Sequence, residues 1–153
     1  MLDRIRSWLD TPAAADRDDP LGTARAVSVL LVAAARADGA FAADEAREIA
    51  TLVSRHYALP PEETAELVHA AASETVDDLF PTARLLVERL DNQARRRVLG
   101  LMWRVVFSDG TLESREDILM RKAARLLDLS HQDLVASRLA IQRANDPEEP
   151  PAD

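Results

Sequence analysis

The sequence contains no cysteine, which excludes a disulfide framework, a thiolate metal site and a cysteine nucleophile. Glycine is scarce, with four residues among 153, so a sheet with many tight hairpins is not expected. No apolar run reaches the roughly 18 residues that a membrane-spanning helix needs. Aromatic residues make up only 4% of the chain. What is abundant is alanine and leucine at helical spacing, which predicts an all-α protein.

Cations are also in short supply, because the chain has 19 Lys and Arg against 27 Asp and Glu and a net charge of −8. Too few positive charges are available to neutralise phosphates, so no nucleic-acid partner is expected. The one basic cluster, Arg95-Arg96-Arg97, is interpreted as a solvated helix face. Charged residues at 3, 4 and 6 interrupt any signal-peptide core, which predicts a cytoplasmic protein.

The apolar pattern predicts one compact bundle of about seven helices. Asp91 is a suitable N-cap, and Ser130 with Asp133 resembles a capping box. We predict three regions along the chain: a short N-terminal helix and linker over 1–20, a helical domain over 21–143, and a disordered acidic tail over 144–153. The predicted helices are 21–37, 43–57, one after Leu59-Pro60-Pro61, 82–90, one from Asp91 to about Val106, 114–127, and one from Ser130.

A repeat divides the helical domain into halves of about 21–75 and 91–143. The stretch ADGAFAADE, ending at Glu45, returns 71 positions later as SDGTLESRE, ending at Glu116. The apolar positions of the preceding helices match at the same offset, so we expect an internal pseudo-twofold arrangement of helical units. Each Asp-Gly pair is predicted to form the turn between two helices, with glycine supplying a left-handed backbone.

The four acids of these turns have two possible roles. Glu45 and Glu116 fall near the third position of a helix, where a carboxylate can accept hydrogen bonds from free N–H groups. Asp38 and Asp109 fall at a helix C-terminus, where a negative charge is disfavoured by about 0.3–1 kcal/mol. An Asx turn could offset that cost, and so could a bound cation.

The spacing Asp-Gly-x5-Glu is the second half of a calcium-binding loop whose first half is missing here. If the two turns converge, Asp38, Glu45, Asp109 and Glu116 could together hold a divalent cation such as Ca²⁺, Mg²⁺ or Mn²⁺. Without a cation, Arg36 or Arg115 could supply the compensating charge instead. Both alternatives remain open at this point.

The paired motifs ADGAFAADE and SDGTLESRE resemble those of the TerB-like family of bacterial tellurite-resistance proteins, over about residues 21 to 141. The resemblance implies an all-helical bundle, an acidic metal-binding centre at the four positions named above, and a link to tellurite and chemical stress. The family domain also occurs beside J domains, but this chain has no His-Pro-Asp tripeptide, so that activity is not implied.

The leading hypothesis is therefore a non-enzymatic, stress-associated domain that binds a divalent cation, a partner protein, or both. A metal-dependent hydrolase using the same carboxylates is one alternative. A structural interaction module, in which the acids only cap helices, is another. Residues 1–10 could add a weak peripheral membrane contact. His56, His69 and His131 are not spaced as a zinc site and are predicted at helix ends or on the surface.

Overall fold

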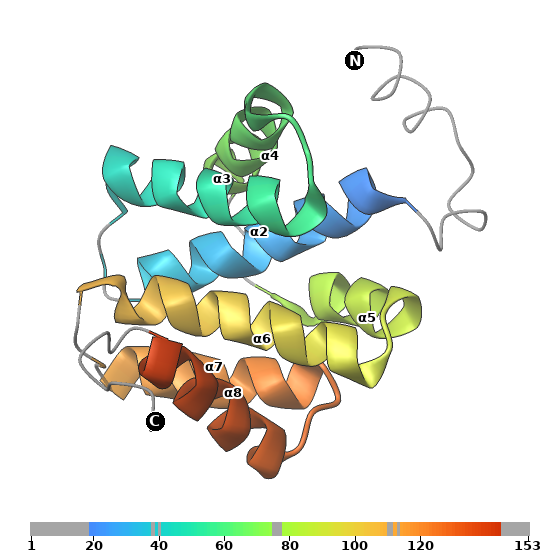
Figure 1. Cartoon of the computed structure of the whole chain (residues 1–153), viewed down its shortest axis with the longest axis vertical. Coiled ribbons are helices and arrows are strands. Elements are labelled where there is room, and N and C mark those ends of the chain that lie inside the picture. Colours follow the sequence, from blue (N-terminus) through green and yellow to red (C-terminus); the bar gives the residue numbers. More distant parts are fainter. Residues whose placement is uncertain are drawn as a thin grey trace, which may run out of the picture.

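A computed structural model describes residues 19–37, 39, 41–74, 78–109, 112 and 114–144, with the side chain of Asp109 excepted. The described part folds into seven α-helices and one short 3₁₀ helix, and it contains no strand, which confirms the all-α prediction (Figure 1). The predicted N-terminal helix, the linker to residue 18 and the acidic tail beyond Ala144 lie outside the described residues. The elements are α2 Pro20–Arg36, α3 Ala43–Tyr57, α4 Pro61–Ser73, α5 Phe80–Arg89, α6 Asn92–Val106, η2 Phe107–Asp109, α7 Ser114–Leu126 and α8 His131–Ala144.

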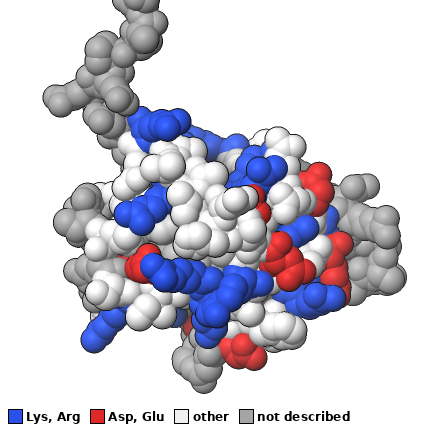
Figure 2. All heavy atoms as spheres, turned by 90° about the horizontal axis from the view of Figure 1, so that it is seen from below, with Lys and Arg blue, Asp and Glu red and all other residues white. Residues whose placement is uncertain are grey.

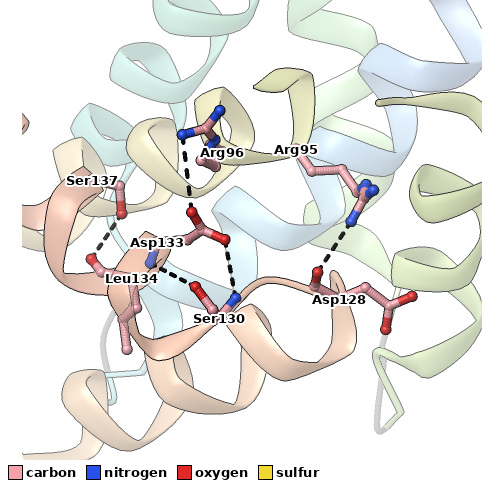
Figure 3. Close-up of polar contacts among 7 residues, drawn as sticks. All are labelled: Arg95, Arg96, Asp128, Ser130, Asp133, Leu134 and Ser137. Atoms are coloured by element: carbon pink, nitrogen blue, oxygen red, sulfur yellow. Dashed lines mark hydrogen bonds and ion pairs between the residues drawn. The ribbon is translucent and has the colours of Figure 1, made fainter. Parts of the chain in front are cut away.

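Side-chain caps fix several of these helix starts as predicted. Asp91 accepts a hydrogen bond from the Ala94 N–H at 2.8 Å and caps α6. At the start of α8, the Asp133 carboxylate accepts from the Ser130 N–H at 3.1 Å, while the Ser130 hydroxyl accepts from the Asp133 N–H at 3.0 Å (Figure 3). This reciprocal pair satisfies two backbone donors that would otherwise lack partners.

The predicted start of the fourth helix, Thr82, is wrong by two residues. Helix α5 begins at Phe80, and Pro81 lies inside its first turn rather than before it. Proline is tolerated there because its missing N–H would have no intrahelical acceptor. The Asp78 carboxylate accepts from the Phe80 N–H at 3.0 Å, and this bond supports the earlier start.

Helix α2 forms the centre of the bundle and packs against α3, α4, α5, α6 and α7 (Figure 1). Its residues Val27, Leu30 and Leu31 are no more than 1% exposed, as are Met102 and Trp103 of α6. Each such burial contributes about 1.5–3 kcal/mol relative to an exposed side chain. Met102 and Trp103 are therefore core residues.

Two turns beyond helix ends, at positions 58 and 128, have the same backbone form, and their separation is one residue less than the 71-residue offset of the repeat. Ala58 has φ 51° and Asp128 has φ 55°, both in the left-handed region. The leucine after each donates its N–H to a carbonyl five residues back, from Leu59 to Ser54 and from Leu129 to Ala124. The match agrees with the sequence repeat locally, while the pseudo-twofold relation of the whole halves stays a prediction.

None of the helices within the described ranges is both long enough and apolar enough to cross a membrane.

Candidate metal centre

The two Asp-Gly turns follow helices that end at the same end of the molecule. Helices α2 and α6 pack against each other and run in the same direction, so their C-termini lie together (Figure 1). A hollow of about 400 Å³ between α2 and α7 touches residues beside both turns. Arg36 and Ala37, just before the first turn, line it together with Arg115, just after the second. The described flanks of the two turns are therefore neighbours in space.

The first turn has the local structure that its sequence predicts. Gly39 has φ +93°, a conformation that strains any L side chain. Phe41 is partly buried and packs on the core, and Ala42 is the N-cap of α3. Leu112 packs on the core in the second turn in the same way. Asp38 and Gly110 lie outside the described residues.

Glu45 has the capping role that its position predicts. It is the third residue of α3, and its Oε1 accepts a hydrogen bond from the Ala42 N–H at 3.0 Å. Ala42 has no side chain that could cap, so the returning carboxylate is the one side-chain cap described at this helix start. The pKa of Glu48, one turn further along, is raised first by its burial and then by the negative charge of Glu45.

Glu116 occupies the matching position in α7 but is much less exposed. Its exposed fraction is 3%, whereas Glu45 is only partly buried. It lies in the first turn of α7, where the positive end of the helix favours a carboxylate. Buried charged groups in proteins are paired with other groups or coordinate metals.

The two arginines considered as compensating charges differ in their contacts. The Arg36 guanidinium donates to the carbonyls of Ala72 and Glu74 at the end of α4 and lies 5.4 Å from the centre of the Phe41 ring. Its described hydrogen bonds thus go to backbone and not to an acid of the turns. Arg115 is exposed and lines the hollow beside Lys122.

Two of the four predicted ligands can be placed with their side chains. Glu45 and Glu116 are described in full, Asp109 is described by its backbone in η2, and Asp38 is not described. Within the described ranges, no three His, Cys, Asp or Glu side chains come close enough to hold a metal ion. The predicted centre includes side chains outside those ranges, so its ligand set stays a prediction.

The interpretation of Arg95-Arg96-Arg97 as a solvated face is wrong for the first arginine. Arg95 is partly buried and donates from Nη1 to the carbonyl of Leu127 at 2.6 Å. The same nitrogen donates to the carbonyl of Asp128 at 3.3 Å (Figure 3). It thereby satisfies carbonyls beyond the end of α7. Arg96 and Arg97 are exposed, as predicted.

Sequence reasoning missed a second hollow, which we call the arginine groove. It has a volume of about 680 Å³ and lies between α3, α6 and α8. Arg55 of α3 and Arg96, Arg97 and Arg104 of α6 line it over an apolar floor that includes Leu101. The available signal was the spacing of Arg97, Leu101 and Arg104, which places all three on one face of a helix.

Comparison with known proteins gives one assignment. Searches of curated proteins and of solved structures found no match. A family model described as "Tellurite resistance protein TerB" matches residues 24–139, which is most of the chain and includes both Asp-Gly turns. The all-α bundle agrees with the fold expected from the motif resemblance. The chain therefore belongs to the TerB family of tellurite resistance proteins.

Proposed function

We propose that this chain is a non-catalytic, cytoplasmic domain of the response to tellurite and chemical stress, which binds a divalent cation where its two Asp-Gly turns meet. Asp38, Glu45, Asp109 and Glu116 would supply carboxylate oxygens, and a protein partner would recognise the cation-bound surface. The observation that carries the proposal is that residues flanking both turns, Ala37 and Arg115, line one hollow.

The chemistry of these side chains selects hard cations. Carboxylate oxygens suit Ca²⁺, Mg²⁺ and Mn²⁺, which take six or more oxygen ligands. Water and backbone carbonyls would complete the set. A cation would also lessen the repulsion between neighbouring acids. Such repulsion is seen at Glu48, whose pKa is raised first by burial and second by the negative charge of Glu45.

Capping and cation binding can be combined at Glu45. The hydrogen bond from the Ala42 N–H uses one oxygen, Oε1. An ionised carboxylate has about four lone-pair positions on two oxygens, so the second oxygen can serve as a ligand. The capping bond then orients the carboxylate in the same way as an outer partner orients a metal ligand.

The test is thermal denaturation of the wild type in chelator and then with Ca²⁺, Mg²⁺, Mn²⁺ or Zn²⁺ added singly. An ion that binds only the native state at 100 times its Kd adds about 2.7 kcal/mol of stability. We expect at least one hard cation to raise the Tm and the double variant Asp38→Asn/Asp109→Asn to lose that rise.

The matched control is Asp44→Asn/Asp117→Asn, which removes two charges from the first turns of α3 and α7 outside the proposed ligand set. This control should keep the rise in Tm. An equal Tm under all conditions for the wild type would overturn the cation proposal and leave the acids as helix caps. Cation-dependent hydrolysis of a phosphoester would overturn the non-catalytic assignment.

A further inference from the structure

Positively charged side chains cluster in the arginine groove, although the chain as a whole is acidic. Four arginines line it, Arg55, Arg96, Arg97 and Arg104, although the net charge of the chain is −8. On the face seen from below, Figure 2 shows Lys and Arg side chains gathered across the middle, with Asp and Glu side chains around them. Charges of one sign that share a groove repel each other unless something negative lies between them.

Most of this charge is not compensated within the described ranges. Arg96 is about half exposed and lies 3.9 Å from the less exposed Asp133 carboxylate, which is a long contact for an ion pair (Figure 3). Arg55, Arg97 and Arg104 form no ion pair with any described carboxylate. The effect reaches His56, whose pKa is lowered first by burial and then by the positive charge of Arg97.

The groove also has an apolar floor, to which α3, α6 and α8 contribute Leu52, Leu101 and Ile141. A ligand for such a surface needs several negative charges together with apolar groups of modest size. An extended, proline-containing acidic segment has both, because proline favours an extended backbone that loses little entropy on docking.

We propose that residues 145–153 of this chain, NDPEEPPAD, fold back onto the arginine groove and are its resident ligand. The segment has four acids, no Lys or Arg, and three prolines. Its acids therefore equal the groove arginines in number. The inference stands apart from the proposed cation site and needs no metal.

The chain geometry allows this contact. Helix α8 lines the groove up to Ile141 and ends at Ala144, so the segment starts beside the groove. Nine residues span up to about 30 Å when extended. From Gln93 to Arg104 the groove follows α6 for about 16 Å, at 1.5 Å per residue.

The covalent link between residues 145–153 and the helical domain favours binding of this segment over binding of a free acidic peptide. Exposed ion pairs are individually weak, so a short free segment would not be held firmly. A tethered segment acts at an effective concentration on the order of millimolar, which lets weak pairs suffice. The other terminal segment, residues 1–10, has two acids and two arginines and so cannot neutralise the groove.

The absence of cysteine makes a direct test possible in the full chain. A nitroxide attached through Ala152→Cys broadens the amide NMR signals of residues near the segment. We expect loss of signal intensity at Leu52, Gly100 and Ala140, which line the groove, and no such loss at Ala65 on the exposed side of α4. At 1 M salt, where the Debye length is about 3 Å, the intensities should recover.

Two variants and one control variant test the charge pairing in the same labelled chain. Arg97→Gln/Arg104→Gln removes groove charges that hold no described ion pair, so the fold should persist and the broadening should fall at least twofold. Arg121→Gln/Arg125→Gln removes two exposed charges from α7 outside the groove and should leave the broadening unchanged. Asp146→Asn/Glu148→Gln/Glu149→Gln should act like the groove variant.

Three results would overturn the proposal. One is broadening that is absent from the groove or centred on another surface. In the second, the nitroxide on one chain broadens the groove signals of a separate, isotope-enriched chain without nitroxide as strongly as those of its own chain. This result would assign the groove to a second copy. The third is equal broadening in Arg97→Gln/Arg104→Gln and in the wild type, which would exclude charge pairing.

Discussion

At the scale of single residues, Glu63 is a buried charge without hydrogen bonds in the described structure. It is 6% exposed, and neither carboxylate oxygen has a partner among the described residues. It holds the third position of α4, where a glutamate usually accepts from the N-cap N–H, but the N-cap here is Pro60, which has none. The positive end of the helix is the remaining stabilising influence described for it.

We therefore expect Glu63→Met to stabilise the protein. Removing an unsatisfied buried carboxylate recovers about 1–3 kcal/mol, while the lost helix-end interaction costs about 0.3–1 kcal/mol. The free energy of unfolding, measured by urea denaturation, should rise by about 1 kcal/mol. Glu62→Met, at the exposed neighbouring position, loses only the helix-end interaction and should lower it slightly. A loss of stability in Glu63→Met would show that the carboxylate has a compensating partner.

Ala58 and Asp128 place side chains in a left-handed backbone, with φ 51° and 55°. This conformation costs an ordinary L residue about 1–2 kcal/mol, and an aspartate less, because its short polar side chain can bond locally. Ala58→Gly should therefore raise the free energy of unfolding by about 0.5–1 kcal/mol, and Asp128→Gly by less. Denaturation of both variants under one set of conditions checks the order. The reverse order would contradict this account of the two turns.

At the scale of secondary structure elements, Arg95 joins α6 to the end of α7. Its Nη1 donates to the Leu127 and Asp128 carbonyls, and its Nε donates to the Leu90 carbonyl at 3.2 Å. Hydrogen bonds from charged donors contribute about 1.5–3 kcal/mol. Arg95→Ala should therefore lower the free energy of unfolding by about 2 kcal/mol.

Arg97→Ala is the matched control, because Arg97 is exposed and has no described hydrogen bond or ion pair. Its effect should lie within about 0.5 kcal/mol of zero. Both variants remove one arginine from α6, so a comparable loss in the two would contradict the role of Arg95 at the end of α7. Amide hydrogen exchange around Leu127 and Leu129 should accelerate in Arg95→Ala alone.

The elements themselves could be predicted from the sequence because their signals are local. Apolar spacing predicted a helix over 43–57, and the structure has the same bounds. Asp91 and Ser130 could be predicted as helix starts because each accepts a hydrogen bond from a residue only three positions away. The fourth helix was predicted to start at about Thr82, after Phe80 and Pro81, whereas both residues lie in its first turn. The role of Arg95 at the end of α7 could not be predicted, because its acceptors there, Leu127 and Asp128, lie more than 30 residues further along the chain.

At the scale of the whole molecule, the sequence indicated which segments to compare but not how they meet. The repeat suggested that two Asp-Gly turns converge, and the shared hollow of Ala37 and Arg115 supports this. The arginine groove could not be predicted in the same way, because Arg55 and Arg97 come from helices far apart in sequence. Such a surface depends on packing, which local periodicity does not encode.

The positive charge of that groove should appear in the pH dependence of the folded protein. Burial and then the charge of Arg97 lower the pKa of His56 below its usual 6.5, so the unfolded chain takes up this proton at higher pH than the native one. Well above pH 6.5 His56 is neutral in both states, and its titration does not affect stability there. As the pH falls through 6.5 towards the native pKa, the unfolded state is favoured and stability declines.

We expect the free energy of unfolding to decline between about pH 7 and 5 in the wild type, and to decline less in His56→Gln. Asp133 does not affect stability between pH 7 and 5, because hydrogen bonds from Ser130 lower its pKa below 3.8. Its protonation lowers the stability of the protein only at more acidic pH. NMR titration of His56 measures the cause directly. Arg97→Gln should raise its pKa towards 6.5, whereas neutralising the acids of residues 145–153 should lower it. An unchanged His56 pKa in both variants would show that the charges of the groove do not affect this histidine.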